Sequence, residues 1–164
     1  MQDFSRDHLF ALRLAHHIYQ ANQGFQMAPT LEEAGAALVK SWNDDLVWHF
    51  REEEEVILPV LSRHMEPSAH PDIRRMLDDH AWLRNALGLL GQHKDGSPSH
   101  LDRDLLVATG QRLHDHVRLE ERRIYPILQE MLTAEELEEI RRGSEAFRRR
   151  WRSEDVIGPF RTHG

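Results

Sequence analysis

The sequence predicts an all-α fold: an up-down-up-down four-helix bundle followed by a short fifth helix near the C-terminal end. Apolar residues recur at spacings of three and four through long segments rich in Leu, Ala, Glu and Arg, without the alternation typical of strands. Short connections between these segments favour antiparallel neighbours. With 164 residues, of which 40% are hydrophobic and 30% charged, the chain can bury a sizeable core. We therefore expect one domain over residues 1–164, with the bundle at about 4–131 and a C-terminal helix and tail at 132–164.

Turn-rich segments separate the expected helices. Gly, Pro, Asn and Ser cluster in "NQGFQMAPT" (22–30), "MEPSAHP" (65–71) and "GQHKDGSPS" (91–99). Thr30 with Glu33, and Thr133 with Glu136, fit capping boxes that mark the starts of two helices. The expected helices cover residues 4–22, 31–64, 70–91, 99–131 and about 134–150.

Each of the four long helices carries one apolar stripe that is interrupted for a single turn. The interruption is a histidine, or a histidine followed four residues later by a glutamate. The four stripes are Phe4, His8, Leu12, Ala15 and Tyr19; Leu38, Trp42, Leu46, His49, Glu53, Val56 and Val60; Ile73, Leu77, His80, Leu83, Leu87 and Leu90; and Leu106, Thr109, Leu113, His116, Glu120, Ile124 and Ile127.

The spacing of His49 with Glu53, and of His116 with Glu120, indicates metal binding. Residues four apart project from one helix face, so both members of a pair can reach the same point inside the bundle. An ionised carboxylate among leucines is costly unless a partner compensates its charge. Imidazole and carboxylate ligands together suit iron, manganese or zinc.

The chain also contains an internal repeat. "HFREEEEVILPVL" (49–61) and "HVRLEERRIYPIL" (116–128) share seven of thirteen residues. An Asp-His pair precedes each copy: Asp7-His8 lies 41 residues before the first histidine and Asp79-His80 lies 36 residues before the second. Two related helical hairpins predict a pseudo-two-fold centre with two metals roughly 3.5–4 Å apart, each held by two histidines and bridged by the glutamates.

The order His, HxxxE, His, HxxxE on four helices resembles the hemerythrin-like, or HHE cation-binding, domain family over about residues 4–131. The resemblance implies that Glu53 and Glu120 bridge two non-haem iron ions, with an oxo or hydroxo group completing the bridge. It implies the metal ligands His8, His49, Glu53, His80, His116 and Glu120. It also implies a protein that binds or senses oxygen, nitric oxide or peroxide, in iron or oxidative-stress handling.

Two departures from the oxygen-carrying members of this family stand against reversible oxygen carriage. Their fifth histidine, one turn after the third-helix ligand, is replaced by Arg84. Their second bridging carboxylate is an aspartate five residues after its histidine, whereas Glu120 follows at four. Two alternative functions stay open: a di-iron oxidase or peroxidase, and an interaction module with a structural metal site.

Several neighbouring residues have more than one reading. His16 or His17 could be the first-helix ligand in place of His8, but we favour His8 because the repeat pairs Asp7-His8 with Asp79-His80. Glu54 could orient a ligand histidine or lie on the surface, and Asp7 and Asp79 could accept a hydrogen bond or be exposed. We expect Glu52 and Glu55 to lie on a solvated face, and Arg148 with the other arginines of the last helix to pair with its glutamates.

Composition excludes several classes of function. The absence of cysteine excludes thiolate zinc sites, iron–sulfur clusters and cysteine nucleophiles. A net charge of −7 argues against nucleic-acid binding. No long apolar segment indicates a signal peptide or a membrane span, so we expect a cytoplasmic monomer or homodimer whose partner is a small diatomic ligand or peroxide.

Overall fold

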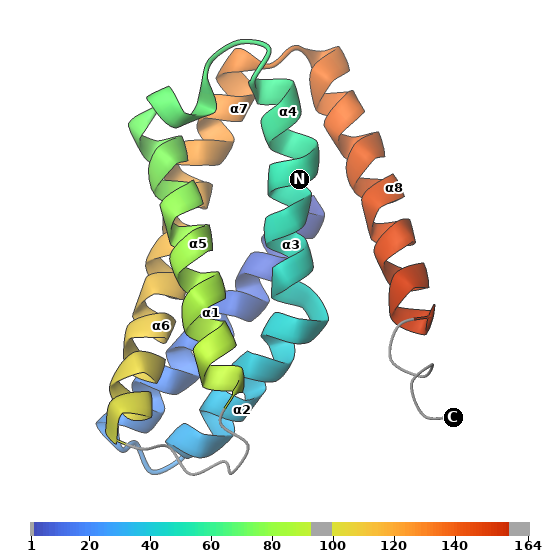
Figure 1. Cartoon of the computed structure of the whole chain (residues 1–164). Coiled ribbons are helices and arrows are strands. Elements are labelled where there is room, and N and C mark those ends of the chain that lie inside the picture. Colours follow the sequence, from blue (N-terminus) through green and yellow to red (C-terminus); the bar gives the residue numbers. More distant parts are fainter. Residues whose placement is uncertain (1, 93–99, 158–164) are drawn as a thin grey trace.

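The computed structural model of this chain describes the backbone of residues 2–92 and 100–157, and the side chains of residues 6–92 and 103–152 (Figure 1). The part that it describes is all-helical. Its elements are α1 (Gln2–Gln23), α2 (Leu31–Ser41), η1 (Trp42–Leu46), α3 (Val47–Glu52), η2 (Glu53–Ile57), α4 (Leu58–Leu61), η3 (Pro67–Ala69), α5 (Pro71–Gly91), α6 (His100–Leu119), η4 (Glu120–Ile124), α7 (Tyr125–Met131) and α8 (Ala134–Ile157). Within these residues, no helix is both long and apolar enough to cross a lipid bilayer.

Both capping boxes predicted from the sequence are present. The Glu33 backbone N–H donates to Thr30 Oγ1 at 3.1 Å, and the Thr30 N–H donates to the Glu33 carboxylate at 2.8 Å. Thr133 and Glu136 make the same exchange, at 3.2 and 2.9 Å, at the start of α8. These caps satisfy backbone donors that a helix start leaves free, so they fix where α2 and α8 begin.

The two copies of the sequence repeat share an unusual backbone feature. A π-helical turn, η2 in one copy and η4 in the other, begins at Glu53 and at Glu120. Pro59 and Pro126 each follow two residues after the turn ends, and the helix continues through them as α4 and α7. The wider π turn precedes each proline, a residue that cannot supply a backbone N–H.

Two apolar clusters fill the interior and leave a polar layer between them. One cluster is built on α1, α2, α3, α5 and α6, and includes Leu38, Phe50 and Leu83. The other joins α4, α5, α7 and α8, and includes Leu61 and Ile73. Along α5, Met76 belongs to the second cluster and Leu83 to the first, so the helical turn that carries His80 lies between them.

Helix α1 faces the core slightly differently from the predicted stripe. Tyr19, expected inside, is 54% exposed, and the buried positions are Ala11, Leu14, Ala15 and Ile18. An α-helix has 3.6 residues per turn, so residues spaced four apart drift gradually around the helix. At this end of α1 the residue that faces the core is therefore Ile18 and not Tyr19.

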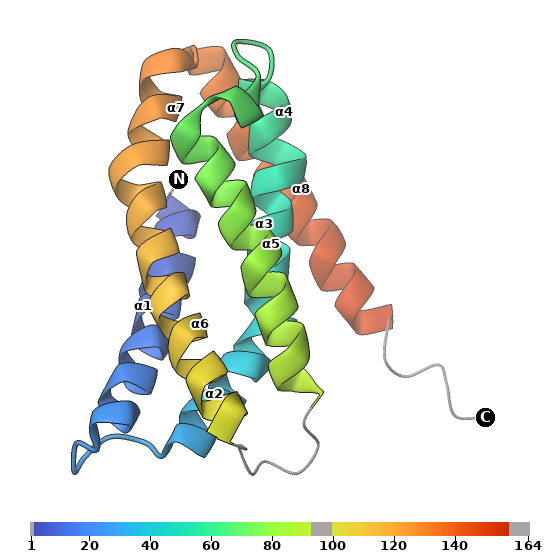
Figure 2. The ribbon, with the colours of Figure 1, turned by 60° about the vertical axis from the view of Figure 1, so that its left-hand side comes forward.

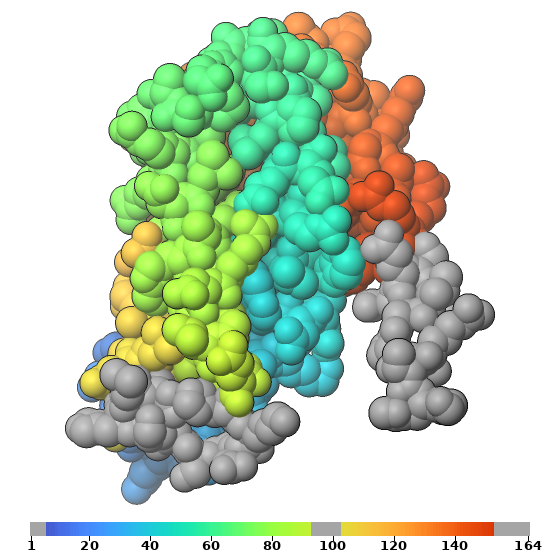
Figure 3. Space-filling model, viewed as in Figure 1, coloured from blue at the N-terminus to red at the C-terminus, as the bar shows by residue number. Residues whose placement is uncertain are grey.

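Helix α8 extends seven residues beyond its expected end at about residue 150. It lies along one side of the segment α3–η2–α4, and Figures 1, 2 and 3 show it packed there as the orange-to-red helix. Ile140 and Phe147 are buried at this contact. A Cβ on Gly143 would lie 2.8 Å from Val56 Cγ1, so the two backbones approach closely at this glycine.

Candidate metal centre

The structure brings all six predicted ligand residues together in the polar layer. His8 comes from α1, His49 from α3, His80 from α5 and His116 from α6, while the two glutamates stand at the first positions of η2 and η4. None is more than 4% exposed: His8, His49, Glu53, His80, His116 and Glu120. Their inward atoms form two groups, each with ligand atoms within 4.8 Å of one another.

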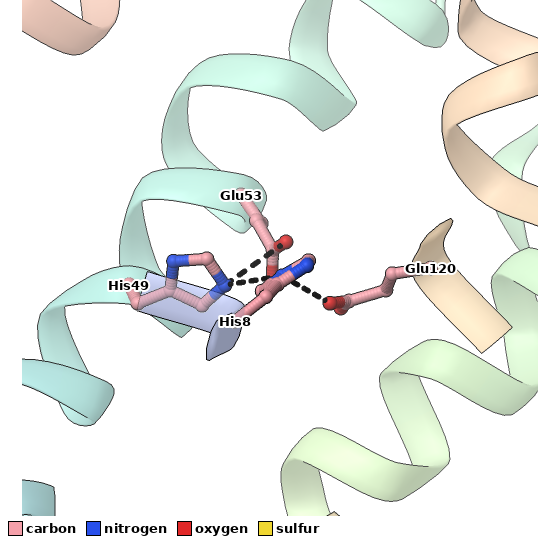
Figure 4. Close-up of side chains that lie close together, drawn as sticks. All are labelled: His8, His49, Glu53 and Glu120. Carbon is pink, nitrogen blue, oxygen red and sulfur yellow. Dashed lines mark hydrogen bonds and ion pairs between the residues drawn. The ribbon is translucent and has the colours of Figure 1, made fainter. Parts of the chain in front are cut away.

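The first group consists of His8, His49, Glu53 and Glu120 (Figure 4). His8 Nε2 lies 2.9 Å from Glu120 Oε2 and 3.2 Å from His49 Nε2. His49 Nε2 lies 3.4 Å from Glu53 Oε1. Two imidazole nitrogens and one oxygen from each glutamate therefore surround a common point.

The second group consists of His80, His116 and the same two glutamates. His80 Nε2 lies 3.2 Å from Glu53 Oε2, and His116 Nε2 lies 2.8 Å from Glu120 Oε1. Each carboxylate thus directs one oxygen to the first group and the other to the second. Two cations, one in each group, could therefore share both carboxylates.

The buried polar atoms that lack hydrogen-bond partners give a second reason, independent of the sequence pattern, to expect a pair of cations here. In the described part of the chain, buried inward atoms approach one another closely, yet Glu53 Oε2, His80 Nε2, His116 Nε2 and both oxygens of Glu120 have no hydrogen-bond partner of acceptable geometry. Buried polar atoms without partners are rare in native proteins, because each costs a desolvation penalty. Bound cations would satisfy all five atoms at once, with nitrogen and oxygen ligands that suit iron, manganese or zinc.

Without cations, protons provide the compensating positive charge. Burial acts to lower the pKa of His116, but Glu120 and Asp79 outweigh it and raise this pKa to about 9. Burial also acts to lower the pKa of His80, but Glu120, Glu53 and Glu54 outweigh it and raise this pKa well above its ordinary value. Despite burial, His116 and its neighbours hold the pKa of Glu120 well below its usual range. Cation binding must therefore displace protons from the histidines.

A second carboxylate faces the outer nitrogen of each histidine. Asp7 Oδ2 lies 3.3 Å from His49 Nδ1, and Glu54 Oε1 lies 2.7 Å from His80 Nδ1. Asp79 Oδ2 lies 3.6 Å from His116 Nδ1, and Glu121 Oε1 lies 3.6 Å from His8 Nδ1. For His49 and His80, an Nδ1–H directed at the carboxylate leaves the Nε2 lone pair facing inward, where a cation would sit. The 3.6 Å contacts of His116 and His8 are too long for hydrogen bonds.

Arginines pair with all four of these outer carboxylates in turn, and Arg118 donates to Glu121 at 3.1 Å. Arg84 donates from both terminal nitrogens to the two oxygens of Glu54, at 2.9 Å each. Arg112 donates to Asp79 at 2.7 Å, and Arg148 donates to Asp7 at 2.9 Å. Despite burial, His80 and Arg84 lower the pKa of Glu54 to about 2. Arg84, which replaces a fifth histidine, therefore acts on the site through Glu54 and is not a ligand itself.

One surface prediction was wrong. Glu52, expected on a solvated face, is 1% exposed. Its carboxylate accepts hydrogen bonds from Arg148 Nε at 3.0 and 3.2 Å, across the contact between α8 and α3. Burial raises the pKa of Glu52, although Arg148 acts to lower it. Arg148 therefore joins α8 to the carboxylates behind the site, whereas Arg141 and Arg142 pair with Glu138 of their own helix as expected.

Sequence reasoning missed one residue inside the site. Tyr125, 9% exposed, places its hydroxyl 3.2 Å from His8 Nε2. Burial and the carboxylates Glu53 and Glu120 raise its pKa above the ordinary tyrosine value. In the repeat, Tyr125 aligns with Leu58, which has no polar group, so the repeat gives no signal for a functional hydroxyl here.

The rival first-helix ligand lies elsewhere. His16 is exposed and its ring faces Tyr19, at a centroid separation of 6.4 Å, so it belongs to neither group of ligand atoms. Glu54 is 28% exposed, so it is both a partner of His80 and in contact with solvent.

Comparison with known proteins agrees with this geometry. A model of the hemerythrin HHE cation-binding domain matches residues 2–128, a range that ends before α8. Neither the curated proteins nor the solved structures contain a match. The matched range covers most of the chain and includes all six converging side chains, so this chain belongs to the hemerythrin HHE cation-binding family.

Proposed function

We propose that this chain is a single-domain, up-down-up-down bundle that holds two non-haem iron ions and uses them to bind or sense oxygen, nitric oxide or peroxide. His8 and His49 would hold one ion, and His80 and His116 the other. Glu53 and Glu120 would bridge them. The observation that carries the proposal is that two groups of buried donor atoms share both glutamates, with one oxygen of each carboxylate in each group.

The protein's own residues account for only part of each ion's coordination. The six side chains supply two nitrogens and two oxygens to each ion, and a bridging oxygen would make about five ligands. A position for a small exogenous ligand would remain. Bound iron would supply the affinity for such a ligand and the capacity for redox change. The outer carboxylates and arginines would keep the four imidazoles oriented, and the two apolar clusters would restrict water.

The first test is metal content. Protein purified and then titrated anaerobically with iron(II) should bind two irons per chain and gain thermal stability. His49→Ala and His116→Ala should each lose at least one iron, whereas His114→Ala, an exposed histidine on the same helix as His116, should bind as the wild type does. A wild-type protein that binds no iron and is not stabilised by it would refute the proposal. Stoichiometric zinc or manganese in its place would retain the site and reject iron.

The second test separates ligand binding from catalysis. The iron-loaded protein should show optical changes on titration with oxygen, nitric oxide or peroxide that saturate at a fixed ratio to protein. Sustained consumption of peroxide over many turnovers would instead support the oxidase or peroxidase alternative. Binding of a partner protein that persists in the His49→Ala and His116→Ala variants would support the interaction module.

A further inference from the structure

We propose that the phenol oxygen of Tyr125 is a seventh protein ligand, bound to the cation that His8 and His49 hold. This inference rests on the proposed metal centre and adds a residue to it. It also makes the two cation positions chemically unequal, although the six other ligands are related by the internal repeat.

The first step is the position of the hydroxyl. Tyr125 Oη lies 3.2 Å from His8 Nε2. Two proposed ligand atoms of the same group lie at similar distances from His8 Nε2: His49 Nε2 at 3.2 Å and Glu120 Oε2 at 2.9 Å. Neighbouring ligand atoms around an octahedral ion with bonds of about 2.1 Å are roughly 3.0 Å apart. The phenol oxygen therefore occupies the distance expected of a neighbouring ligand.

The second step is a competition for His8. His8 Nε2 faces into the site, and when it carries a lone pair it is an acceptor within reach of the Tyr125 hydroxyl, at 3.2 Å. A cation bound to His8 takes that lone pair. The phenol O–H bond would then break and its proton leave to solvent as the phenol oxygen binds the cation. The nearly parallel rings of His8 and Tyr125, 4° apart, hold the two side chains beside each other.

The third step is the internal repeat. Tyr125 stands five residues after Glu120, and Leu58 stands five residues after Glu53. A leucine has no ligand atom, so the His80–His116 cation gains nothing equivalent. The His8–His49 cation would have five protein ligands and its partner four. The open position, and with it the binding of a small ligand, would therefore lie at the His80–His116 cation.

The chain offers a clean spectroscopic test because it contains only two tyrosines, Tyr125 and the exposed Tyr19. Phenolate bound to iron(III) absorbs visible light through charge transfer, and resonance Raman excitation in that band enhances tyrosinate vibrations. The iron(III)-loaded wild type and Tyr19→Phe should show the band and these vibrations. Tyr125→Phe, which removes one oxygen and keeps the ring, should lose both while it binds the same amount of iron. Gallium(III), which has no redox chemistry, should produce an ultraviolet tyrosinate signal in the wild type and in Tyr19→Phe, but none in Tyr125→Phe.

The outcomes separate this inference from the proposed function. A wild-type protein that binds two irons, shows no tyrosinate vibrations and has the spectrum of Tyr125→Phe would overturn the ligand role and leave the di-iron centre standing. A wild-type protein that binds no metal would overturn both. If Tyr125→Phe failed to fold, the Raman and gallium measurements on the wild type and Tyr19→Phe would still decide the question.

Discussion

Replacing Arg148 with methionine should destabilise the protein strongly at neutral pH. Arg148 is 17% exposed, and it is the charged partner of Glu52, whose side chain is only 2% exposed. Methionine preserves much of the apolar length of the arginine side chain but removes its charge. The variant therefore leaves a carboxylate buried without a compensating cation, between α8 and the helix that carries His49 and Glu53.

The expected loss of stability follows from the two protonation states that Glu52 can adopt in the folded variant. In the folded variant it must remain ionised without a partner or take up a proton. For a carboxyl group with an ordinary pKa of 4.5, proton uptake at pH 7 costs about 3.4 kcal/mol, which limits the penalty. We expect Arg148→Met to lower the free energy of unfolding by about 3 kcal/mol at pH 7, or Tm by roughly 6–12 °C. At pH 5.5 protonation costs only about 1.4 kcal/mol, so the loss should shrink as the pH falls.

Denaturant unfolding of metal-free protein at both pH values measures this loss. Arg142→Met is the matched control, because Arg142 is 74% exposed and its surface pair with Glu138 should contribute no more than about 1 kcal/mol. Adding Glu52→Gln to Arg148→Met should restore part of the stability, since glutamine carries no charge. Equal losses for the two arginine variants, or a loss of the same size at pH 5.5 and pH 7, would refute the argument.

Three further predictions follow from single contacts. Gly143→Ala places a methyl group 2.8 Å from the stiff Val56 side chain and should lower the free energy of unfolding, measured with denaturant, by about 1–3 kcal/mol. Gly88→Ala, with nothing within 4 Å, should be neutral or stabilising, and equal effects of the two variants would contradict this packing. Neighbouring carboxylates outweigh burial and raise the pKa of His116 to about 9, so zinc must displace a proton from His116 below that pH. For this proton alone, zinc affinity should rise about tenfold per pH unit up to about pH 9, and an affinity that does not change from pH 6 to 8 would contradict this prediction. Thr133→Ala should cost about 0.5–2 kcal/mol and speed hydrogen exchange at the start of α8, and unchanged exchange there would argue against the cap.

The helices could be predicted from the sequence because their apolar residues follow a regular spacing. The central residues of the site could be predicted because they interrupt that spacing. Glu53 and Glu120 interrupt apolar stripes, and an interior carboxylate is too costly to occur there without a compensating partner. The i, i+4 histidines then give the direction in which each carboxylate points. Local spacing contains this information, so no knowledge of the tertiary structure was needed.

The same reasoning failed where the environment of a residue depends on a distant segment. Glu52 belongs to a run of four glutamates, and nothing nearby distinguishes it from Glu55. Its burial comes from Arg148, 96 residues later in the chain, and therefore from the position of α8. Tyr125 was missed for a different reason: it lies outside the predicted apolar stripe of its helix, and the repeat aligns it with Leu58, which has no polar group. The hydrophobic periodicity also does not predict the π turns at Glu53 and Glu120, although a proline follows at the same offset in both copies of the repeat.

The outer carboxylates show why the two halves of the chain depend on each other. Within each half, an aspartate before one histidine faces the next, as Asp7 faces His49. Between the halves, Glu54 faces His80 and Glu121 faces His8. His8 of α1 and His80 of α5 therefore each face a carboxylate from the other half, next to Glu120 or Glu53, which reaches across as well. Neither hairpin alone contains all the oxygens that its own histidines face, because those beside His8 and His80 come from the other half. The repeat can thus form a complete centre only when both hairpins pack together, which ties the assembly of the site to the assembly of the bundle.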